Sequence, residues 1–568
     1  MGRLEECLMD FSINSLKTYL GDELVDTLIE WTPENEPLFT KKKLTDMIMT
    51  IHGNEIFKNR DFRRDLLEKM TDKELEGLKQ ITNQRTDDLS LLIENVVKIP
   101  WKDNAVSAYI TKILNLKVNF NKENLEQNVI NQVESTDRFF ELLDYQYYVK
   151  QRILNILNDD SEQLKRVLIQ MPTGTGKTKT AMHIIVNYIL FSLKKEGLVI
   201  WVAHTTELLE QAYSTFVNVW KHLGDGEITA YKIWGNSDLL SIDSSLNGIA
   251  FCGISKLTAM SKSNPNLFEK LEENCRLIFF DEAHKAAAAE TRKIIEKLME
   301  YKQYDKSLVG LTATPGRTTE DTFDNNLLSN MFENRLIGID LKTVYQMNMS
   351  KLQMQNADIE NSIVQYFQNM HVLAKIRKEE LCYQESFTDA EINSIQSVAK
   401  SNGYTDFSKK TLETIGRNKS RNMAIMNRLT ELYDEGKNVI VFTCSVEQAK
   451  LLSAMLELQE IETALIIGDM PAIEREKAIE KFKNRNSTLK IIINYEVLTT
   501  GFDATNINCV FIARPTQSVV LYSQMLGRGL RGSKMGGNDE CLLIDVKDNL
   551  NKYNEKMAFS HFENYWKA

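Results

Sequence analysis

The sequence has few of the features that mark secreted, membrane-spanning or fibrous proteins. Its seven cysteines are odd in number and never form a C-x-x-C pair, which favours neither a disulfide framework nor a zinc site. With only 8 prolines and 25 glycines, the composition excludes collagen-like and largely disordered chains. No apolar run approaches the roughly 18 residues of a membrane span, and no signal-peptide core is present. We therefore expect a cytoplasmic protein without a membrane partner.

A surplus of positive charge is also missing. The chain has 69 basic and 79 acidic residues, a net charge of -10, whereas nucleic-acid-binding domains usually carry a basic surplus. The imbalance is uneven, because residues 1–135 hold 18 basic and 24 acidic residues, more than half of the net negative charge. Net charge therefore does not exclude nucleic acid as a partner for the rest of the chain.

The residue patterns divide the 568 residues into three regions. Residues 1–132 have apolar residues at helical spacing and a capping-box sequence from Thr71 to Glu74, so an all-helical N-terminal domain is expected. Residues 133–340 and 341–568 alternate apolar β-branched runs with helical stretches, which is typical of α/β parallel sheets. The third region also holds an insertion, predicted to be helical, at about 345–415. The expected strands are 166–171, 198–204, 249–252, 276–280, 307–311, 438–442, 464–467, 489–493, 509–512 and 541–544.

A glycine-bearing loop follows the first of these strands and precedes a predicted helix. Its residues are Pro172, Thr173, Gly174, Thr175, Gly176, Lys177 and Thr178. Glycines let backbone amides wrap an anion, a lysine can reach the β and γ phosphates, and a threonine hydroxyl can ligate Mg²⁺. Met171 stands where the usual phosphate-loop pattern has its first glycine. The loop predicts a nucleotide site, with a surface turn and a solvated lysine as the alternative.

Two adjacent carboxylates end a later apolar run. Asp281 and Glu282 can divide the work of holding Mg²⁺ and activating the attacking water as general base. A solvated pair at a strand end is the alternative. The phosphate loop on a neighbouring strand favours the catalytic interpretation, with Asp281 on Mg²⁺ and Glu282 as the base.

A glutamine and two arginines near the end of the chain have helical spacing. Gln524, Arg528 and Arg531 fall at i, i+4 and i+7, so on a helix they would share a face and could converge on one phosphate. Two permanently charged guanidiniums would stabilise the charge that develops in the transition state. A basic helix face in solvent is the alternative.

These segments together resemble the motifs of superfamily 2 helicases and translocases. The phosphate loop resembles motif I, D-E-A-H at 281–284 resembles motif II, and T-A-T-P at 312–315 resembles motif III. Residues 495–503 and 524–531 resemble motifs V and VI. The resemblance covers roughly residues 140–345 and 415–548. It implies two tandem RecA-like domains that bind ATP and Mg²⁺ between them and hydrolyse ATP.

The resemblance also implies roles for further residues. Tyr145 and Gln146 resemble the motif that recognises adenine, with a core tyrosine at a helix start as the alternative, and Gly501 and Asp503 of motif V join the nucleotide site. His284, Thr312 and Thr314 would couple ATP hydrolysis to movement. Contacts with the nucleic-acid backbone, which position a strand without reading its sequence, are implied for Thr205, Thr206, Ser255, Lys256, Thr443, Ser445 and Thr499.

Finer features favour one branch of the superfamily. Q-x-x-G-R-G-x-R at 524–531 and L-L-I-D at 542–545 are similar to the DNA-directed XPB-like and RadD-like proteins and the motors of type I and type III restriction systems. Only 20 residues separate Asp503 from Gln524, which leaves no room for the strand-separating hairpin that DEAH-type RNA helicases and several processive DNA helicases insert there. We predict a DNA helicase or double-stranded DNA translocase, in DNA repair or anti-phage defence. An RNA helicase, or a nucleotide-gated sensor acting on a partner protein through residues 1–132, remains the alternative.

Overall fold

The structure is a computed structural model of the chain. It describes residues 3–32, 39–84, 86, 88–101, 105–116, 130–134, 141–159, 165–235, 246–300, 305–315, 322–339, 363–383, 406–468, 470–499, 501–502, 504–516 and 518–547. Within these ranges, no helix combines the length and the apolar character that crossing a membrane requires.

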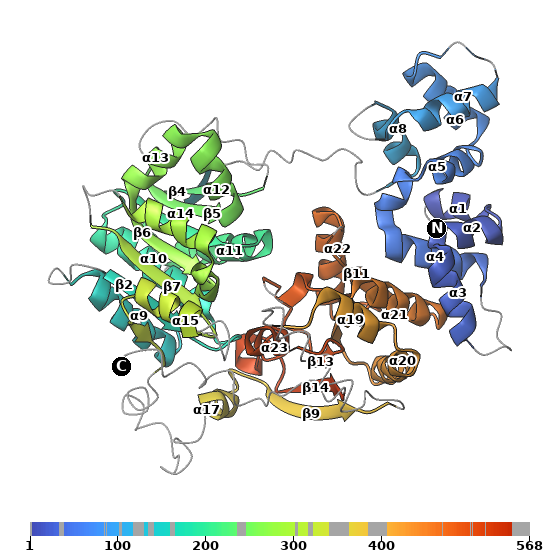
Figure 1. Cartoon of the computed structure of the whole chain (residues 1–568). Coiled ribbons are helices and arrows are strands. Elements are labelled where there is room, and N and C mark those ends of the chain that lie inside the picture. Colours follow the sequence, from blue (N-terminus) through green and yellow to red (C-terminus); the bar gives the residue numbers. More distant parts are fainter. Residues whose placement is uncertain are drawn as a thin grey trace.

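The N-terminal domain consists of short helices packed around a shared core (Figure 1). They are α1 (Arg3–Met9), α2 (Ile13–Leu20), α3 (Asp22–Trp31), α4 (Lys41–His52), η1 (Gly53–Lys58), α5 (Arg60–Leu67), α6 (Asp72–Ile81), α7 (Leu89–Lys98) and α8 (Ala105–Ile113). The predicted capping box is confirmed, since the Thr71 amide donates to the Glu74 carboxylate at 2.7 Å and the Thr71 hydroxyl accepts from the Glu74 amide. Aromatic contacts tie the helices together, with Tyr19 and Phe62 edge to face at 5.1 Å.

The second region of the chain, residues 133–340, is called domain 1, and the third region, residues 341–568, is called domain 2. Domain 1 is built on an eight-stranded sheet in the order β1-β4-β5-β3-β6-β7-β2-β8. Only β1 is antiparallel to its neighbour. The strands are β1 (Ile130–Glu134), β2 (Lys165–Gln170), β3 (Leu198–Ala203), β4 (Glu227–Ile233), β5 (Gly248–Gly253), β6 (Cys275–Asp281), β7 (Ser307–Thr312) and β8 (Leu336–Ile337). All five strands expected in this region are confirmed. The others were not expected, and β1 lies where the helical region was predicted to end.

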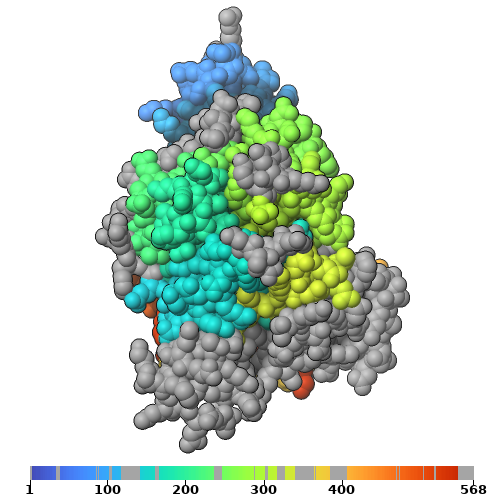
Figure 2. Space-filling model, turned by 90° about the vertical axis from the view of Figure 1, so that its left-hand side faces the viewer, coloured from blue at the N-terminus to red at the C-terminus, as the bar shows by residue number. Residues whose placement is uncertain are grey.

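Helices cover both faces of this sheet. One core is formed with α9 (Asp144–Leu157), α10 (Lys177–Asn187), the π-helical turn η2 (Tyr188–Ser192) and α11 (Thr206–Leu223). The opposite core is formed with α12 (Ile254–Ser263), α13 (Pro265–Asn274), η3 (Ala283–Ala287), α14 (Ala289–Met299) and α15 (Thr322–Met331). Burial on both faces explains why β3 and β5 are continuous apolar runs in the sequence. Figure 2 looks onto domain 1, which fills the centre of the view below the N-terminal helices.

Domain 2 has a six-stranded parallel sheet in the order β11-β12-β10-β13-β14-β9. Its strands are β9 (Lys375–Leu381), β10 (Val439–Phe442), β11 (Thr463–Ile466), β12 (Ile491–Asn494), β13 (Cys509–Ile512) and β14 (Glu540–Val546). Its helices are α17 (Ile363–Asn369), α19 (Lys409–Gly416), α20 (Lys419–Asp434), α21 (Val446–Leu458), α22 (Ala472–Lys483), η4 (Val497–Thr499), α23 (Val519–Leu526) and η5 (Ser533–Met535). The five strands expected here are confirmed.

The insertion predicted to be helical differs from that expectation in one part. It contains α17 and α19, but Lys375–Leu381 is an edge strand that pairs with β14. The segment reads K-I-R-K-E-E-L, and a charged sequence of this kind suits an edge strand, because its side chains reach solvent while the backbone bonds to one neighbour.

The N-terminal domain packs against domain 2, although domain 1 follows it in the sequence (Figure 1). Helix α4 lies on α21 and β11, and the Lys43 ammonium donates to the Leu458 carbonyl at 2.6 Å. An ion pair joins Lys419 and Glu30 at 3.2 Å. We call this contact the docking face.

Candidate active site

The phosphate-loop sequence forms the turn between β2 and α10. Gly174 and Gly176 have positive φ angles of 86° and 80°, which glycine adopts without strain. A Cβ atom on Gly176 would lie 2.4 Å from Nε2 of Gln146. Met171 is fully buried, so the position that usually holds the first glycine serves here as a core residue.

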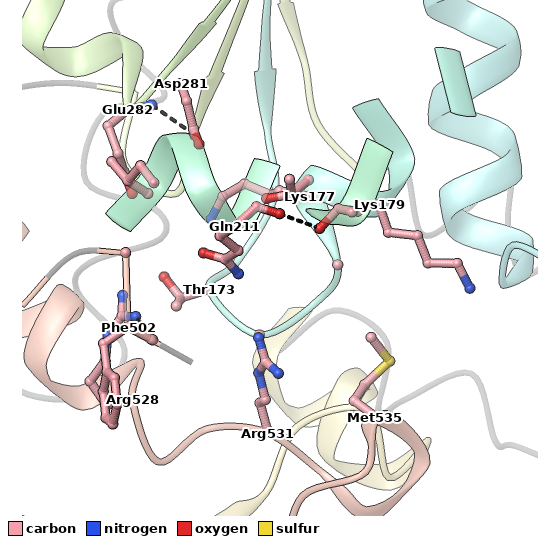
Figure 3. A pocket seen from close by; sticks show the side chains of 16 residues that line it. Thr173, Lys177, Lys179, Gln211, Asp281, Glu282, Phe502, Arg528, Arg531 and Met535 are labelled. Carbon is pink, nitrogen blue, oxygen red and sulfur yellow. Dashed lines mark hydrogen bonds between the residues drawn. The ribbon is translucent and has the colours of Figure 1, made fainter. Parts of the chain in front are cut away.

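The two predicted carboxylates lie at the end of β6, close to this loop. Glu282 has a left-handed backbone with φ of 53°, and its amide donates to Oδ1 of Asp281 at 2.9 Å (Figure 3). Such strain in a residue other than glycine is frequent at functional sites. Burial and the charge of Glu282 raise the pKa of Asp281 to about 7. Burial opposes ionisation of Glu282 as well, but the hydrogen bond and charge of His284 lower the pKa of Glu282 to about 2, so this carboxylate stays ionised.

The three residues expected to act in coupling form one buried chain with Glu282. Nδ1 of His284 lies 3.3 Å from the Glu282 carboxylate and 3.3 Å from Oγ1 of Thr312. The Thr312 hydroxyl donates to the carbonyl of Thr314 at 2.7 Å and accepts from its amide at 3.0 Å. The chain joins the end of β6 to the end of β7, so a change at Glu282 can reach the loop after β7.

The predicted arginines approach the loop from domain 2, but not on a common helix. Helix α23 ends at Leu526, so Gln524 is helical while Arg528 and Arg531 lie beyond the helix end. The condition for a shared helical face, a helix that continues through Arg531, is therefore not met. Gly527, the C-cap residue of α23, packs closely against Thr173 of the phosphate loop, because a Cβ atom on this glycine would lie 2.5 Å from the threonine methyl group.

A cleft of about 210 Å³ brings these groups together between the two domains (Figure 3). Of the predicted residues, it is lined by Thr173, Gly174, Gly176, Lys177, Thr178, Asp281, Glu282, Gly501, Arg528 and Arg531. Burial lowers the pKa of Lys177, whereas the carboxylates of Glu282 and Asp281 favour its charged form. The four cations that line the cleft, with Lys179 as the fourth, suit a polyphosphate. The Thr178 hydroxyl and the Asp281 carboxylate are oxygen ligands of the kind that Mg²⁺ prefers, so the donor set fits this ion.

Other predicted nucleotide residues do not line the cleft. Pro172 and Thr175 are buried in the loop, where the Thr175 hydroxyl donates to the Pro172 carbonyl at 2.7 Å. Tyr145 and Gln146 are also buried, and both donate to the Thr175 carbonyl, at 2.8 and 2.9 Å. In this structure the pair supports the phosphate loop from behind. Gln524 lies outside the lining, and Asp503 lies outside the described residues.

The residues predicted to hold a nucleic-acid backbone fall into two groups. In the first group, Thr205, Thr206, Ser255 and Lys256 lie at the start of a helix that follows a strand, and Thr499 ends the short turn η4 after β12. All five are exposed or half-buried.

Thr443 and Ser445 are different, because they are buried. The Thr443 hydroxyl donates to main-chain carbonyls, and the Ser445 hydroxyl caps α21 by accepting from the Gln448 amide at 3.1 Å. Gly416 of α19 packs over Ser445, where a Cβ atom on the glycine would lie 3.6 Å from the serine hydroxyl oxygen. Direct nucleic-acid contact by these two side chains is not supported in this conformation, because both side chains are shielded from solvent.

The cleft also contains residues that sequence reasoning missed. They are Lys179, Leu208, Gln211, Thr215, Phe502 and Met535. Lys179 follows the phosphate loop directly, and Leu208 and Gln211 lie shortly after the predicted residues Thr205 and Thr206, so closeness to a predicted residue was the available signal. Met535 comes from the turn η5 and had no such signal.

Two parts of the chain match known families. Residues 139–317 match the family described as type III restriction enzyme, res subunit, and residues 422–533 match the helicase conserved C-terminal domain. The putative ATP-dependent helicase IRC3 of Saccharomyces cerevisiae is 25% identical over 417 residues, which cover 71% of this chain and 51% of that relative. The EcoKI type I restriction enzyme endonuclease subunit of Escherichia coli is 22% identical over 415 residues, 68% of this chain and 33% of that protein.

Similarity to solved structures is found at low identity. The DUF1998 helicase MrfA, solved bound to DNA, has a TM-score of 0.49 and 15% identity, over 78% of this chain and 54% of that chain. The present chain spans about half the length of the first curated relative, IRC3.

The fold and the cleft define a protein with two RecA-like domains that share one phosphate-binding site. The two family matches and these relatives support a superfamily 2 helicase related to restriction-enzyme motors.

Proposed function

We propose that this protein hydrolyses ATP in the cleft between its two domains and uses the cycle to move along DNA. The observation that carries the proposal is the convergence in one cleft of Lys177 and two carboxylates from domain 1 with Arg528 and Arg531 from domain 2. A site divided between two domains is complete only when they are together, so nucleotide binding and hydrolysis can drive closing and opening.

Each residue has a role that follows from its position. Lys177 and the loop amides bind the phosphates, and Glu282, ionised and held by His284, takes the proton of the attacking water. Arg528 and Arg531 stabilise the charge on the transferred phosphoryl group. Thr178 and Asp281 would hold Mg²⁺, which would supply positive charge to neutralise the phosphates.

DNA is the proposed track for two reasons. The relationship to restriction-enzyme subunits supports a DNA substrate. In addition, the segment between Phe502 and α23 is occupied by β13 and its flanking turns, so the described residues there contain no strand-separating hairpin. The proposed path runs past the exposed Thr206 and Ser255 and the half-buried Thr205 and Thr499, which follow the carboxyl ends of strands.

The test compares ATPase rates with single-stranded DNA, duplex DNA and RNA, together with strand displacement. Stimulation by duplex DNA without displacement supports a translocase, and displacement supports a helicase. Stimulation by RNA alone would replace DNA with RNA as the track. No stimulation by any nucleic acid would overturn the motor proposal.

A nucleotide-gated sensor is the second candidate, favoured by the docking of the acidic N-terminal domain on domain 2. In that case ATP binding would change how residues 1–132 meet a partner protein. A role in DNA repair or anti-phage defence, and a cytoplasmic location, remain predictions. A neighbouring nuclease gene would support the defence role.

A further inference from the structure

Helix α11 connects the residues proposed to hold nucleic acid with domain 2 and with the nucleotide cleft. Its first turn follows Thr205 and Thr206, and Glu207 in that turn is hydrogen bonded to Arg475 of domain 2. A Cβ on Gly501 would lie 2.8 Å from Cβ of Glu207, so the helix also meets the motif V loop. Over the first two to three turns of the helix, Leu208, Gln211 and Thr215 line the nucleotide cleft.

Gln211 is the polar residue of this helix that faces the middle of the cleft. It lies four residues after Glu207, on the same side of the helix. In Figure 3 its carboxamide extends into the space between Lys177 and Thr173, on the side of the two arginines. The main-chain carbonyl of Gln211 accepts a hydrogen bond from the Thr215 hydroxyl at 2.7 Å. Among the described residues, no side-chain or main-chain group forms a hydrogen bond with the carboxamide of Gln211.

A carboxamide is chemically suited to this place. Its NH₂ group can donate to a phosphate oxygen and its carbonyl oxygen can accept from a water molecule, without adding charge to a cleft that already holds ions of both signs. Glutamine performs the related task of orienting the attacking water in other phosphate-loop hydrolases. The carboxamide lies beside Lys177, whose ammonium is expected at the β and γ phosphates.

We propose that Gln211 binds the terminal phosphate of ATP. This contact couples the nucleotide state to Thr205 and Thr206, the residues at the start of α11 that are proposed to hold nucleic acid. This inference rests on the proposed ATPase function and adds a contact to it. ADP lacks the phosphate that Gln211 binds, so the helix loses this contact after hydrolysis. Because α11 is a continuous helix, a shift at Gln211 reaches Glu207 and the loop at Thr205 and Thr206.

The experiment measures binding of a non-hydrolysable ATP analogue and of ADP to the full chain and to Gln211→Ala. Loss of one hydrogen bond to a charged phosphate should reduce the preference for the analogue over ADP about 10-fold, while ADP affinity stays unchanged. Gln211→Glu, nearly identical in shape, should reduce it further because a carboxylate then faces the phosphates. The matched control is Asn218→Ala, which removes an exposed amide from the same helix outside the cleft lining.

Coupling has its own readout. Duplex DNA affinity should differ between the analogue-bound and ADP-bound states of the wild-type chain, and this difference should shrink in Gln211→Ala but not in Asn218→Ala. An unchanged analogue preference in both Gln211 variants would overturn the inference, and a wild-type chain without any difference in DNA affinity would overturn the coupling. Lys177→Ala distinguishes a failure of this inference from a failure of the proposed function. If that variant still binds nucleotide, the proposed ATP site itself is contradicted, whatever Gln211 does.

Discussion

The guanidinium of Arg475 in domain 2 donates a hydrogen bond to the carboxylate of Glu207 in domain 1. Both residues lie in the first turns of their helices, α22 and α11, and both side chains are mostly shielded from solvent. The pair therefore joins the two domains near the residues proposed to hold nucleic acid. Its energetic weight is expected to exceed that of an exposed ion pair, because fewer water molecules compete with it.

Reversing one charge of this pair should impair the motor. Arg475→Glu or Glu207→Arg places like charges together and should lower nucleic-acid-stimulated kcat/KM about 10-fold or more. The double variant, with the charges exchanged, should recover part of the activity. Lys483→Glu, an exposed position at the end of α22, is the control. Equal loss in the double variant and the single variants would show that the pair itself is unimportant.

Lys177→Ala and Glu282→Gln should separate binding from hydrolysis. The first removes the cation at the phosphates and should abolish nucleotide binding, measured by titration with a fluorescent analogue. The second keeps the shape of the side chain but removes the base, so ATP should bind while turnover falls at least about 100-fold. Glu290→Gln, an exposed position in α14, should behave as wild type. Turnover retained in Glu282→Gln would exclude this residue as the base.

Arg528→Lys and Arg531→Lys should retain ATP binding and lose hydrolysis. Lysine keeps the charge but not the planar fork, so each variant should reduce kcat strongly, toward the roughly 1,000-fold effect typical of arginine fingers, with a small change in KM. Single-turnover kinetics measure the chemical step directly. If ATP affinity falls as much as kcat in these variants, the arginines act in ATP binding and not in stabilising the transition state.

Glu457 at the end of α21 should make stability depend on pH. Burial raises the pKa of Glu457 to about 7, with Asp46 and Glu462 acting in the same direction against hydrogen bonds from Thr463. The folded state therefore holds this proton more tightly than the unfolded chain, and its contribution to stability is present below about pH 4.5 and lost as the pH rises through about 7. At pH 8, Glu457→Gln should raise Tm and increase the free energy of unfolding by up to about 3 kcal/mol. At pH 5 both increases should be much smaller. Equal Tm shifts at both pH values would contradict the assignment.

Much of the core architecture could be predicted because buried parallel strands leave a strong trace. Segments such as Leu198–Ala203 and Cys509–Ile512 are apolar throughout, and each was recognised. Strands that bury one side or lie at an edge leave a weaker trace. Glu227–Ile233 alternates buried and less buried positions, and Lys375–Leu381 is mostly charged, so neither was expected.

The site could be predicted where chemistry demands a particular residue type, as at Lys177, Asp281 and Arg528. It could not be predicted where tertiary packing decides which atoms are reachable. Thr443 and Gln146 have the expected identities, yet their polar atoms are used inside the protein. Gln211 enters the cleft only because α11 packs against the interface between the domains. No local sequence pattern indicates that packing.

The docking face also bears on which pieces of this chain can exist alone. Helix α4 packs on α21 and β11, so the N-terminal helices and domain 2 share one continuous hydrophobic core. A fragment cut at residue 139, where the family match begins, would expose that apolar surface to water and should aggregate. For expression and structural work, the smallest soluble unit is therefore set by this shared core and not by the limits of the helicase motifs.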